Sequence, residues 1–173
     1  MWLRTRIVSC VSLVLAAAAA IRADVKVGDV FPRFASMGVV NLAGGDVPAT
    51  TGHVMLVDFW ASWCAPCKAS FPAMAKIYAD YSSRGLVVAA VSVDEKPANA
   101  VAFWKKMAPP FITLHDRGQN LVKEVVVPTM PSSYVLGRDG KVRFIHEGFH
   151  GDPTDREIRR EIELLLAEKD STP

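Results

Sequence analysis

The stretch of sequence that decides the fold is Val57-Asp58-Phe59-Trp60-Ala61-Ser62-Trp63-Cys64-Ala65-Pro66-Cys67-Lys68. Residues 54–60 are nearly all apolar, which is typical of a central strand covered on both faces. From Cys64 to about Ser82, apolar side chains recur at spacings of three and four and predict an amphipathic helix with Pro72 inside it. The two cysteines therefore stand where a buried strand gives way to a helix.

A cysteine at the start of a helix is chemically activated. Unpaired backbone N–H groups and the positive end of the helix dipole favour a thiolate, so the pKa of Cys64 is expected to fall and Cys64 to be the nucleophile. Cys67 follows one turn later on the same face, where its thiol can attack a mixed disulfide formed at Cys64. We interpret Cys64 and Cys67 as a redox-active disulfide.

Two other uses of the cysteine pair fit the sequence poorly. A structural disulfide between residues three apart closes a very small loop and stabilises little, because the entropic gain grows with loop length. A zinc site needs about four ligands. Besides the pair, the mature chain offers only histidines without ligand-like spacing, namely His53, His115, His146 and His150. We therefore expect neither a metal nor another cofactor.

Residues 1–23 have the pattern of a secretory signal peptide. Arg4 and Arg6 precede an uncharged apolar stretch, residues 7–21, and Ala23 is a small residue at the expected cleavage site. The apolar stretch is shorter than the ~20 residues that comfortably span a bilayer. This length favours removal of the signal over anchoring of the protein by an uncleaved one.

Removal of the signal leaves a mature chain of residues 24–173 and eliminates Cys10, so that only Cys64 and Cys67 remain. We expect export to an oxidising compartment, the bacterial periplasm. The chain has 173 residues, of which 50% are hydrophobic, and this is enough for one globular domain and short for two. Its net charge of +2, with both signs interspersed, gives no reason to expect nucleic acid as a partner, and we expect a monomer.

The rest of the chain predicts an alternation of strands and helices. Residues 24–51 are rich in Gly and Pro, with a turn at 44–46, and indicate an N-terminal β-hairpin. Asp152, followed by Pro153, indicates the N-cap of the last helix. Between these segments we expect strands at 86–93 and 111–114, a helix at 97–107, and a hairpin with strands at 134–136 and 142–146. The predicted class is α/β, a central mixed β-sheet with helices on both faces and an N-terminal β-hairpin extension.

The stretch around the cysteines resembles the active site of the thioredoxin superfamily, and in particular of its exported TlpA-like branch. Val27-Gly28-Asp29 and Phe31-Pro32-Arg33-Phe34 resemble the N-terminal extension of that branch. Ser70-Phe71-Pro72 places a proline where the first helix of the family is kinked. The resemblance covers nearly the whole mature chain and implies a thioredoxin-like fold.

The resemblance also assigns a role to Asp58, which matches the buried acid that exchanges a proton with the inner cysteine. Burial among apolar side chains should raise the pKa of Asp58 and suit this role. Two positions depart from the family: Ala90 stands where thioredoxin has a lysine near the acid, and Ser70 stands where many TlpA-like proteins have a second acid. We expect Asp58 to supply the proton transfer alone.

Other residues are expected to contact a bound client. The family has a cis-proline loop opposite the cysteines, and the residue order favours Met130-Pro131 over Pro128, which we expect to be trans. With Trp63 and Pro66, this loop would form the substrate-binding surface. Trp60, in contrast, should face the core.

These residues favour an exported thiol:disulfide oxidoreductase, most simply a reductase that acts on exported client proteins and receives electrons from a membrane donor. A thiol peroxidase is the enzymatic alternative, but the proline and threonine ahead of a lone peroxidatic cysteine are missing. A binding module or metallochaperone built on the same fold is the non-catalytic alternative. The intact cysteine pair argues against the first of these, and the lack of clustered Met or His ligands against the second.

Iodoacetamide should alkylate the reduced protein near neutral pH at Cys64 and not at Cys67, because only Cys64 is expected to be both accessible and thiolate-rich. Mass mapping of the alkylated peptides measures the two sites separately. Preferential modification of Cys67 would reverse the roles given to the two cysteines.

Overall fold

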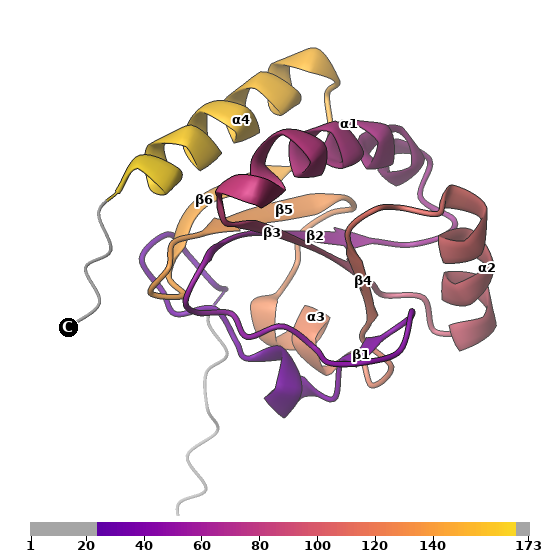
Figure 1. The fold of residues 1–173 in the computed structure, drawn as a ribbon. Coiled ribbons are helices and arrows are strands. Elements are labelled where there is room, and N and C mark those ends of the chain that lie inside the picture. Colours follow the sequence, from indigo (N-terminus) through magenta and orange to yellow (C-terminus); the bar gives the residue numbers. More distant parts are fainter. Residues whose placement is uncertain (1–23, 169–173) are drawn as a thin grey trace, which may run out of the picture.

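The computed structural model describes residues 24–168, and these residues form a mixed sheet with the strand order β1-β4-β3-β2-β5-β6 (Figure 1). Strands β2, β3 and β4 are parallel to one another, whereas β1, β5 and β6 are antiparallel to their neighbours. The predicted signal peptide, residues 1–23, lies outside the described residues. The strands are β1 (Val40–Asn41), β2 (Val54–Trp60), β3 (Leu86–Ser92), β4 (Ile112–His115), β5 (Ser132–Leu136) and β6 (Val142–Glu147).

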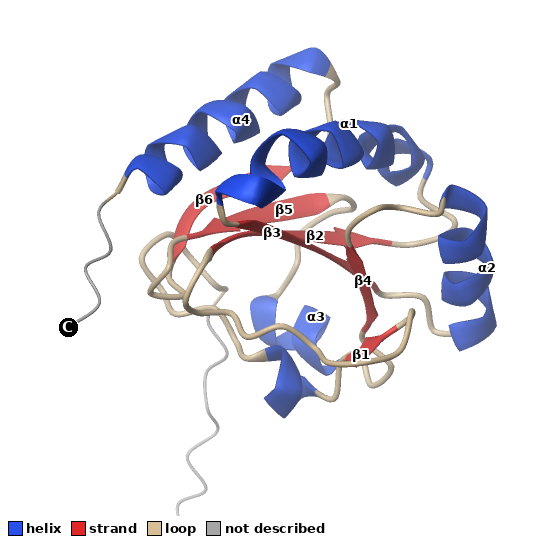
Figure 2. Ribbon diagram, in the orientation of Figure 1, coloured by secondary structure: helices blue, strands red, loops and turns tan. Residues whose placement is uncertain are grey.

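Helices cover both faces of this sheet, which confirms the predicted α/β architecture. The helices are α1 (Ala65–Tyr81), α2 (Pro97–Met107), α3 (Asn120–Val125) and α4 (Asp152–Ala167). Figure 2 shows α1 and α4 on one face of the sheet and α3 on the opposite face. Helix α2 lies to the side, next to β4. No helix within residues 24–168 is long and apolar enough to cross a membrane.

Strand β2 lies in the middle of the sheet, and all of its residues are buried. Its sequence, apolar except for Asp58, suits a position with neighbours on both edges and helices on both faces. At its end, Trp60 is fully buried, as expected, and its ring lies 4.5 Å from that of Phe103 and 5.3 Å from that of Phe71. This aromatic cluster joins α1 and α2 to the end of β2, where the cysteines follow.

Helix α1 begins directly after Cys64 and continues as one helix through Pro72. A proline inside a helix removes one backbone hydrogen bond. The buried stripe that includes Phe71, Met74 and Ile77 packs onto the sheet and holds the helix together across this position. The predicted helix is therefore confirmed to within a residue at each end.

The predicted N-terminal β-hairpin is wrong. Residues 24–51 instead form a short 3-10 helix, Phe34–Met37, and the strand β1, which pairs with β4 and not with another strand of the same segment. Phe31 and Phe34 are buried in the main core. The short apolar pieces of this segment pack individually against the domain, because none is long enough to sustain a two-stranded ladder.

Two helices also differ from the prediction. The N-cap of α4 is Gly151 and not Asp152, so that Asp152 lies in the first turn, where its carboxylate interacts favourably with the positive end of the helix dipole. Helix α3 was not predicted, because six residues are too few for a periodic pattern. A local signal does exist in Asp116, whose carboxylate accepts hydrogen bonds from the backbone N–H groups of Asn120 and Val122 at 3.0 and 2.9 Å.

Replacement of Gly140 by Ala should destabilise the fold more than replacement of Gly45 by Ala. Both glycines have positive φ, 75° and 85°, and an alanine at either site costs about 1 kcal/mol of backbone strain. Only at Gly140 would a Cβ atom also meet the chain, 2.8 Å from Thr51 Cγ2 and 3.0 Å from the Thr50 carbonyl oxygen. We expect urea unfolding to give a further loss of about 1–2 kcal/mol for Gly140→Ala. Equal losses for the two variants would show that the β5–β6 turn is not packed on residues 50–51.

Candidate active site around the Cys64–Cys67 disulfide

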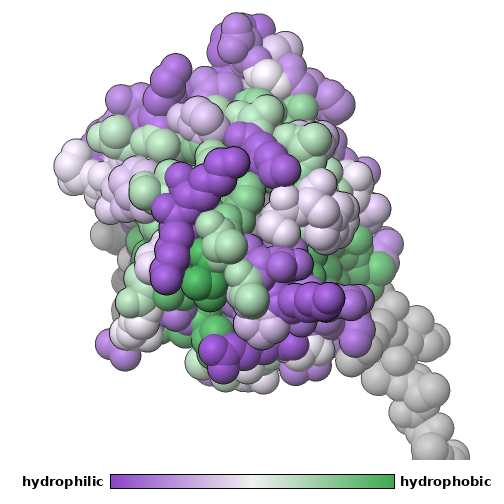
Figure 3. Space-filling view, turned by 90° about the vertical axis from the view of Figure 1, so that its right-hand side faces the viewer, coloured by the Kyte–Doolittle hydropathy of each residue, from purple (hydrophilic) through white to green (hydrophobic). Residues whose placement is uncertain are grey.

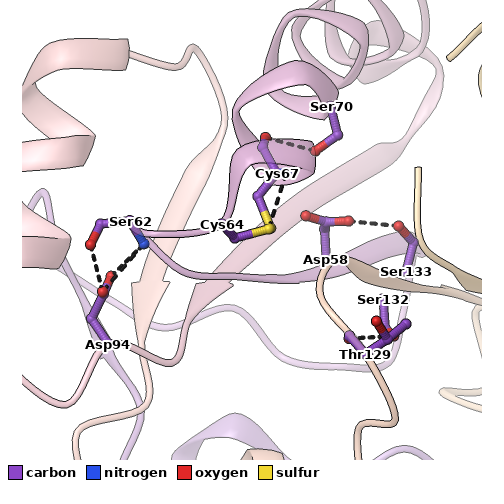
Figure 4. Close-up of a disulfide and its surroundings, with 9 residues drawn as sticks. All are labelled: Asp58, Ser62, Cys64, Cys67, Ser70, Asp94, Thr129, Ser132 and Ser133. Carbon is purple, nitrogen blue, oxygen red and sulfur yellow. Dashed lines mark hydrogen bonds between the residues drawn. A yellow bond between two sulfur atoms is a disulfide. The ribbon is translucent and has the colours of Figure 1, made fainter. Parts of the chain in front are cut away.

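Cys64 and Cys67 form a disulfide at the junction of β2 and α1, with their Cα atoms 5.3 Å apart (Figure 4). Cys64 is the N-cap of α1, and its sulfur accepts a hydrogen bond from the backbone N–H of Cys67 at 3.1 Å. Cys64 was expected to be exposed but is only 4% exposed in this oxidised form, and Cys67 is fully buried. The outer sulfur thus lies at the positive end of a helix, where a thiolate is stabilised, and the inner sulfur is shielded from solvent.

Asp58 is buried in the middle of the sheet, two residues before the end of β2. Its Oδ1 accepts a hydrogen bond from the Ser133 hydroxyl at 2.6 Å, whereas its Oδ2 has no hydrogen-bond partner within the described residues. Burial raises the pKa of Asp58 to about 7, and the bond from Ser133 opposes this change. Figure 4 shows the carboxylate beside the disulfide, with the oxygen that is not bonded to Ser133 on the side of the sulfurs.

The strand register explains why the carboxyl is desolvated. Asp58 is paired with Ala90 on β3 and with Ser133 on β5. The methyl group of Ala90 therefore lies next to Asp58, at the position that the family resemblance assigns to a lysine in thioredoxin. On the other side, Ser133 donates the hydrogen bond. Sequence reasoning missed Ser133. Its signal was a pair of serines at the start of an otherwise apolar strand.

Asp94 is a second buried acid that sequence reasoning missed, and it holds the loop in front of the cysteines. Its carboxylate accepts hydrogen bonds from the backbone N–H of Ser62 at 3.0 Å, from the Ser62 hydroxyl at 2.7 Å and from the Ser92 hydroxyl at 2.9 Å. The Asp94 carbonyl oxygen lies 2.8 Å from Nε2 of His115. Strands β3 and β4 are thereby tied to the cysteine loop. The available signal was an acid directly after a long apolar strand.

The expected client-binding residues lie around the disulfide. The Met130–Pro131 peptide bond is cis, and the bond before Pro128 is not, as predicted. Trp63 is 68% exposed, and Pro66 is exposed in the first turn of α1. Trp63 and Met130 line a groove of about 390 Å³, together with residues 93–96. We call it the Trp63–Met130 groove; Pro66 lies outside it.

No group of three or more His, Cys, Asp or Glu side chains within residues 24–168 is arranged to hold a metal ion. Two of the four histidines have other partners: His115 contacts the Asp94 carbonyl, whereas His146 is paired with Glu161 at 2.7 Å.

Four features define this chain as a member of the thioredoxin superfamily. They are a thioredoxin-like sheet, a cysteine pair at the start of the first helix, a buried acid beneath this pair, and a cis-proline before the adjacent strand. Comparison with known proteins agrees with this class. The Redoxin family model matches residues 26–162, and the chain belongs to this family. A solved structure from Chlorobium tepidum, provisionally named a thiol:disulfide interchange protein DsbE, is 32% identical with a TM-score of 0.74. The similarity covers 83% of this chain and 99% of that one.

Curated relatives of this chain are named thiol-disulfide oxidoreductases. The thiol-disulfide oxidoreductase ResA of Oceanobacillus iheyensis is 29% identical over 126 residues, which are 71% of this chain and 66% of that protein. The ResA protein of Geobacillus thermodenitrificans is 28% identical over 66% of this chain and 64% of its own length. The chain thus matches slightly less than two thirds of the length of these relatives. It belongs to a family of thiol-disulfide oxidoreductases with a Cys-x-x-Cys pair.

Replacement of Asp58 by Asn should stabilise the oxidised protein in a pH-dependent manner. The folded carboxyl has a pKa of about 7 against an ordinary 3.8, so that the folded state binds more protons between these values and the wild type loses stability as pH rises through them. The advantage of Asp58→Asn should be small near pH 4 and grow to the order of 4 kcal/mol above pH 7. Urea unfolding across this range measures it.

Ser133→Ala provides a second variant for the same measurement. It removes the hydrogen bond that lowers the folded pKa of Asp58, so the loss of stability with rising pH should continue to a higher pH than in the wild type. An advantage of Asp58→Asn that does not change with pH would contradict a raised pKa at Asp58.

Proposed function

We propose that this protein is an exported thiol:disulfide oxidoreductase that reduces disulfides in other exported proteins. The observation that carries the proposal is the position of Cys64 and Cys67: one sulfur at the N-terminus of α1, the other buried beside an acid whose pKa is about 7. The relatives named thiol-disulfide oxidoreductase support the activity. The signal-like residues 1–23 support export.

The reaction begins with the reduced pair. The Cys64 thiolate attacks one sulfur of a client disulfide, which forms a mixed disulfide and releases the other client sulfur as a thiolate that takes up a proton. Cys67 then loses its proton and attacks the sulfur of Cys64. This step forms the Cys64–Cys67 disulfide and releases the second client thiolate, so that two electrons pass from the protein to its client. The described structure has the geometry of this oxidised product.

Asp58 is the group that takes the proton from Cys67 in the second step. A buried thiol is hard to ionise without a base, and the carboxyl of Asp58 lies beside the disulfide with one oxygen free of hydrogen bonds. A pKa of about 7 lets the carboxyl accept a proton and release it again near neutral pH. Ser133 then has the role of orienting the carboxyl through its other oxygen.

The client reaches Cys64 through the Trp63–Met130 groove. Two observations support this route: Cys64 is only 4% exposed, and its chain neighbour Trp63 lines the groove together with Met130, which precedes the cis Pro131. Pro66 extends the exposed apolar rim on the helix side. Net reduction requires that the Cys64–Cys67 pair be more reducing than the client disulfides. It also requires a second dithiol that reduces the Cys64–Cys67 disulfide again, and a membrane donor in the same compartment is suited to this.

A Cys67→Ser variant should accumulate mixed disulfides with client proteins in the cells that produce it, because the resolving attack is lost while the Cys64 nucleophile remains. Non-reducing gels followed by mass spectrometry of the adducts identify the captured proteins and the cysteine that holds them. The matched control is Cys64→Ser/Cys67→Ser, which should capture nothing. If adducts of Cys67→Ser do not exceed those of the control, dithiol exchange at Cys64 is refuted.

A further inference from the structure

A second groove, of about 500 Å³, lies on the other flank of the cysteine loop, between the first turns of α1 and one side of α2. Its walls include Ser62, Lys68, Asn99, Phe103, Lys106 and Met107. We call it the α2 groove. Figure 3 views the molecule from this side and shows apolar surface bordered by long hydrophilic side chains.

The α2 groove adjoins the Trp63–Met130 groove at Asn99, which lines both. Ser62 and Trp63, which are consecutive, face one groove each, and Lys68 directly follows Cys67. A polypeptide whose disulfide is held at Cys64 can therefore continue past Asn99 into the α2 groove without leaving the surface.

The floor of the α2 groove is apolar and fixed in place. Phe103 is 7% exposed, and its ring is held at 4.5 Å from Trp60 and 5.0 Å from Phe71. Met107, beside it, has a flexible side chain that adapts to ligands of different shape. The side-chain amide of Asn99 has no hydrogen-bond partner within residues 24–168 and is available to a bound backbone.

The rim of the groove is positively charged. Lys68 and Lys106 are exposed, and neither forms an ion pair with a carboxylate of the described chain. The position of Lys106 in the last turn of α2 suits the helix dipole, but Lys68 stands in the first turn of α1, where the dipole disfavours a cation. Helix α2 contains no Asp or Glu to offset them. Two unpaired cations beside an apolar floor are complementary to carboxylates that flank an apolar side chain.

We propose that the α2 groove binds an acidic segment of the client polypeptide, with an apolar side chain on Phe103 and Met107 and carboxylates beside Lys68 and Lys106. The proposal rests on the proposed disulfide reduction and narrows its substrate class. The preferred clients are proteins in which acidic residues lie close to the disulfide that is reduced.

The first part of the test measures binding without redox chemistry. Two labelled, disulfide-free peptides, one containing Glu-Leu-Glu-Glu and the other Lys-Leu-Lys-Lys at the same place, are titrated with the protein by fluorescence anisotropy. Lys106→Glu is compared with Lys105→Glu, since Lys105 is exposed on the same helix turn but does not line the groove. The two variants change the net charge and the helix end equally.

The wild type should bind the acidic peptide more tightly than the basic one, and added salt should weaken this preference. Lys106→Glu should weaken acidic-peptide binding about three- to tenfold, and Lys105→Glu less than about twofold. Equal affinity of the wild type for the two peptides, or equal losses in the two variants, would overturn the proposal.

The second part of the test separates this proposal from the function on which it rests. The same two sequences, placed next to a disulfide, serve as substrates of the reduced protein, and hydroxyethyl disulfide serves as a neutral substrate too small to reach the groove. Lys106→Glu should lower kcat/KM for the acidic substrate only. A wild type that reduces none of the three refutes the proposed function, whereas the binding titration still decides the groove.

Discussion

The burial of β2 on both faces is the constraint on which the rest of the structure depends. Every residue of the strand is buried between β3 and β5, so its end cannot shift relative to its neighbours. The pairing of Phe59 with Ser132 sets the cis Pro131 beside the end of β2, where the cysteine loop begins. The core, and not the site residues themselves, therefore fixes the disulfide relative to the cis-proline loop and to Asp58.

The same constraint makes Asp58 unfavourable for stability, because an ionised carboxylate in this position loses its hydration. Among residues 24–168, the Ser133 hydroxyl is the one group that donates a hydrogen bond to the carboxylate, and Ala90 on the other side contributes a methyl group. The proton affinity of the acid is thus set by burial and one hydrogen bond, with no neighbouring cation in the strand register. A group that opposes folding and lies beside a reactive pair is expected where function has overridden stability.

Local patterns predicted most of the elements that position the site. Strands β2 and β3 were predicted correctly from their apolar runs, and helix α1 from its periodicity. The cis bond at Pro131 was predicted correctly from the residue order before β5. Each of these signals depends on residues that are close in the sequence. The N-terminal hairpin was wrong because the true partner of Val40 is His115, far along the chain, and two residues of β1 carry no signal for it. Ser133 and Asp94 were missed for a similar reason, since their roles depend on groups brought close only by the fold.

Asp94 supports the cysteine loop from the side opposite Asp58. Its carboxylate binds both the backbone and the hydroxyl of Ser62, and its third bond comes from Ser92 at the end of β3. The loop is thus attached to the carboxyl ends of two parallel strands, although Trp63, the next residue, is largely exposed. Asp94 lines the Trp63–Met130 groove, and its partner Ser62 lines the α2 groove, so these hydrogen bonds hold one wall of each groove in place. Under the proposed function, a client that fits the two grooves would lose little affinity to ordering of the loop, and its own sequence would decide how well it binds.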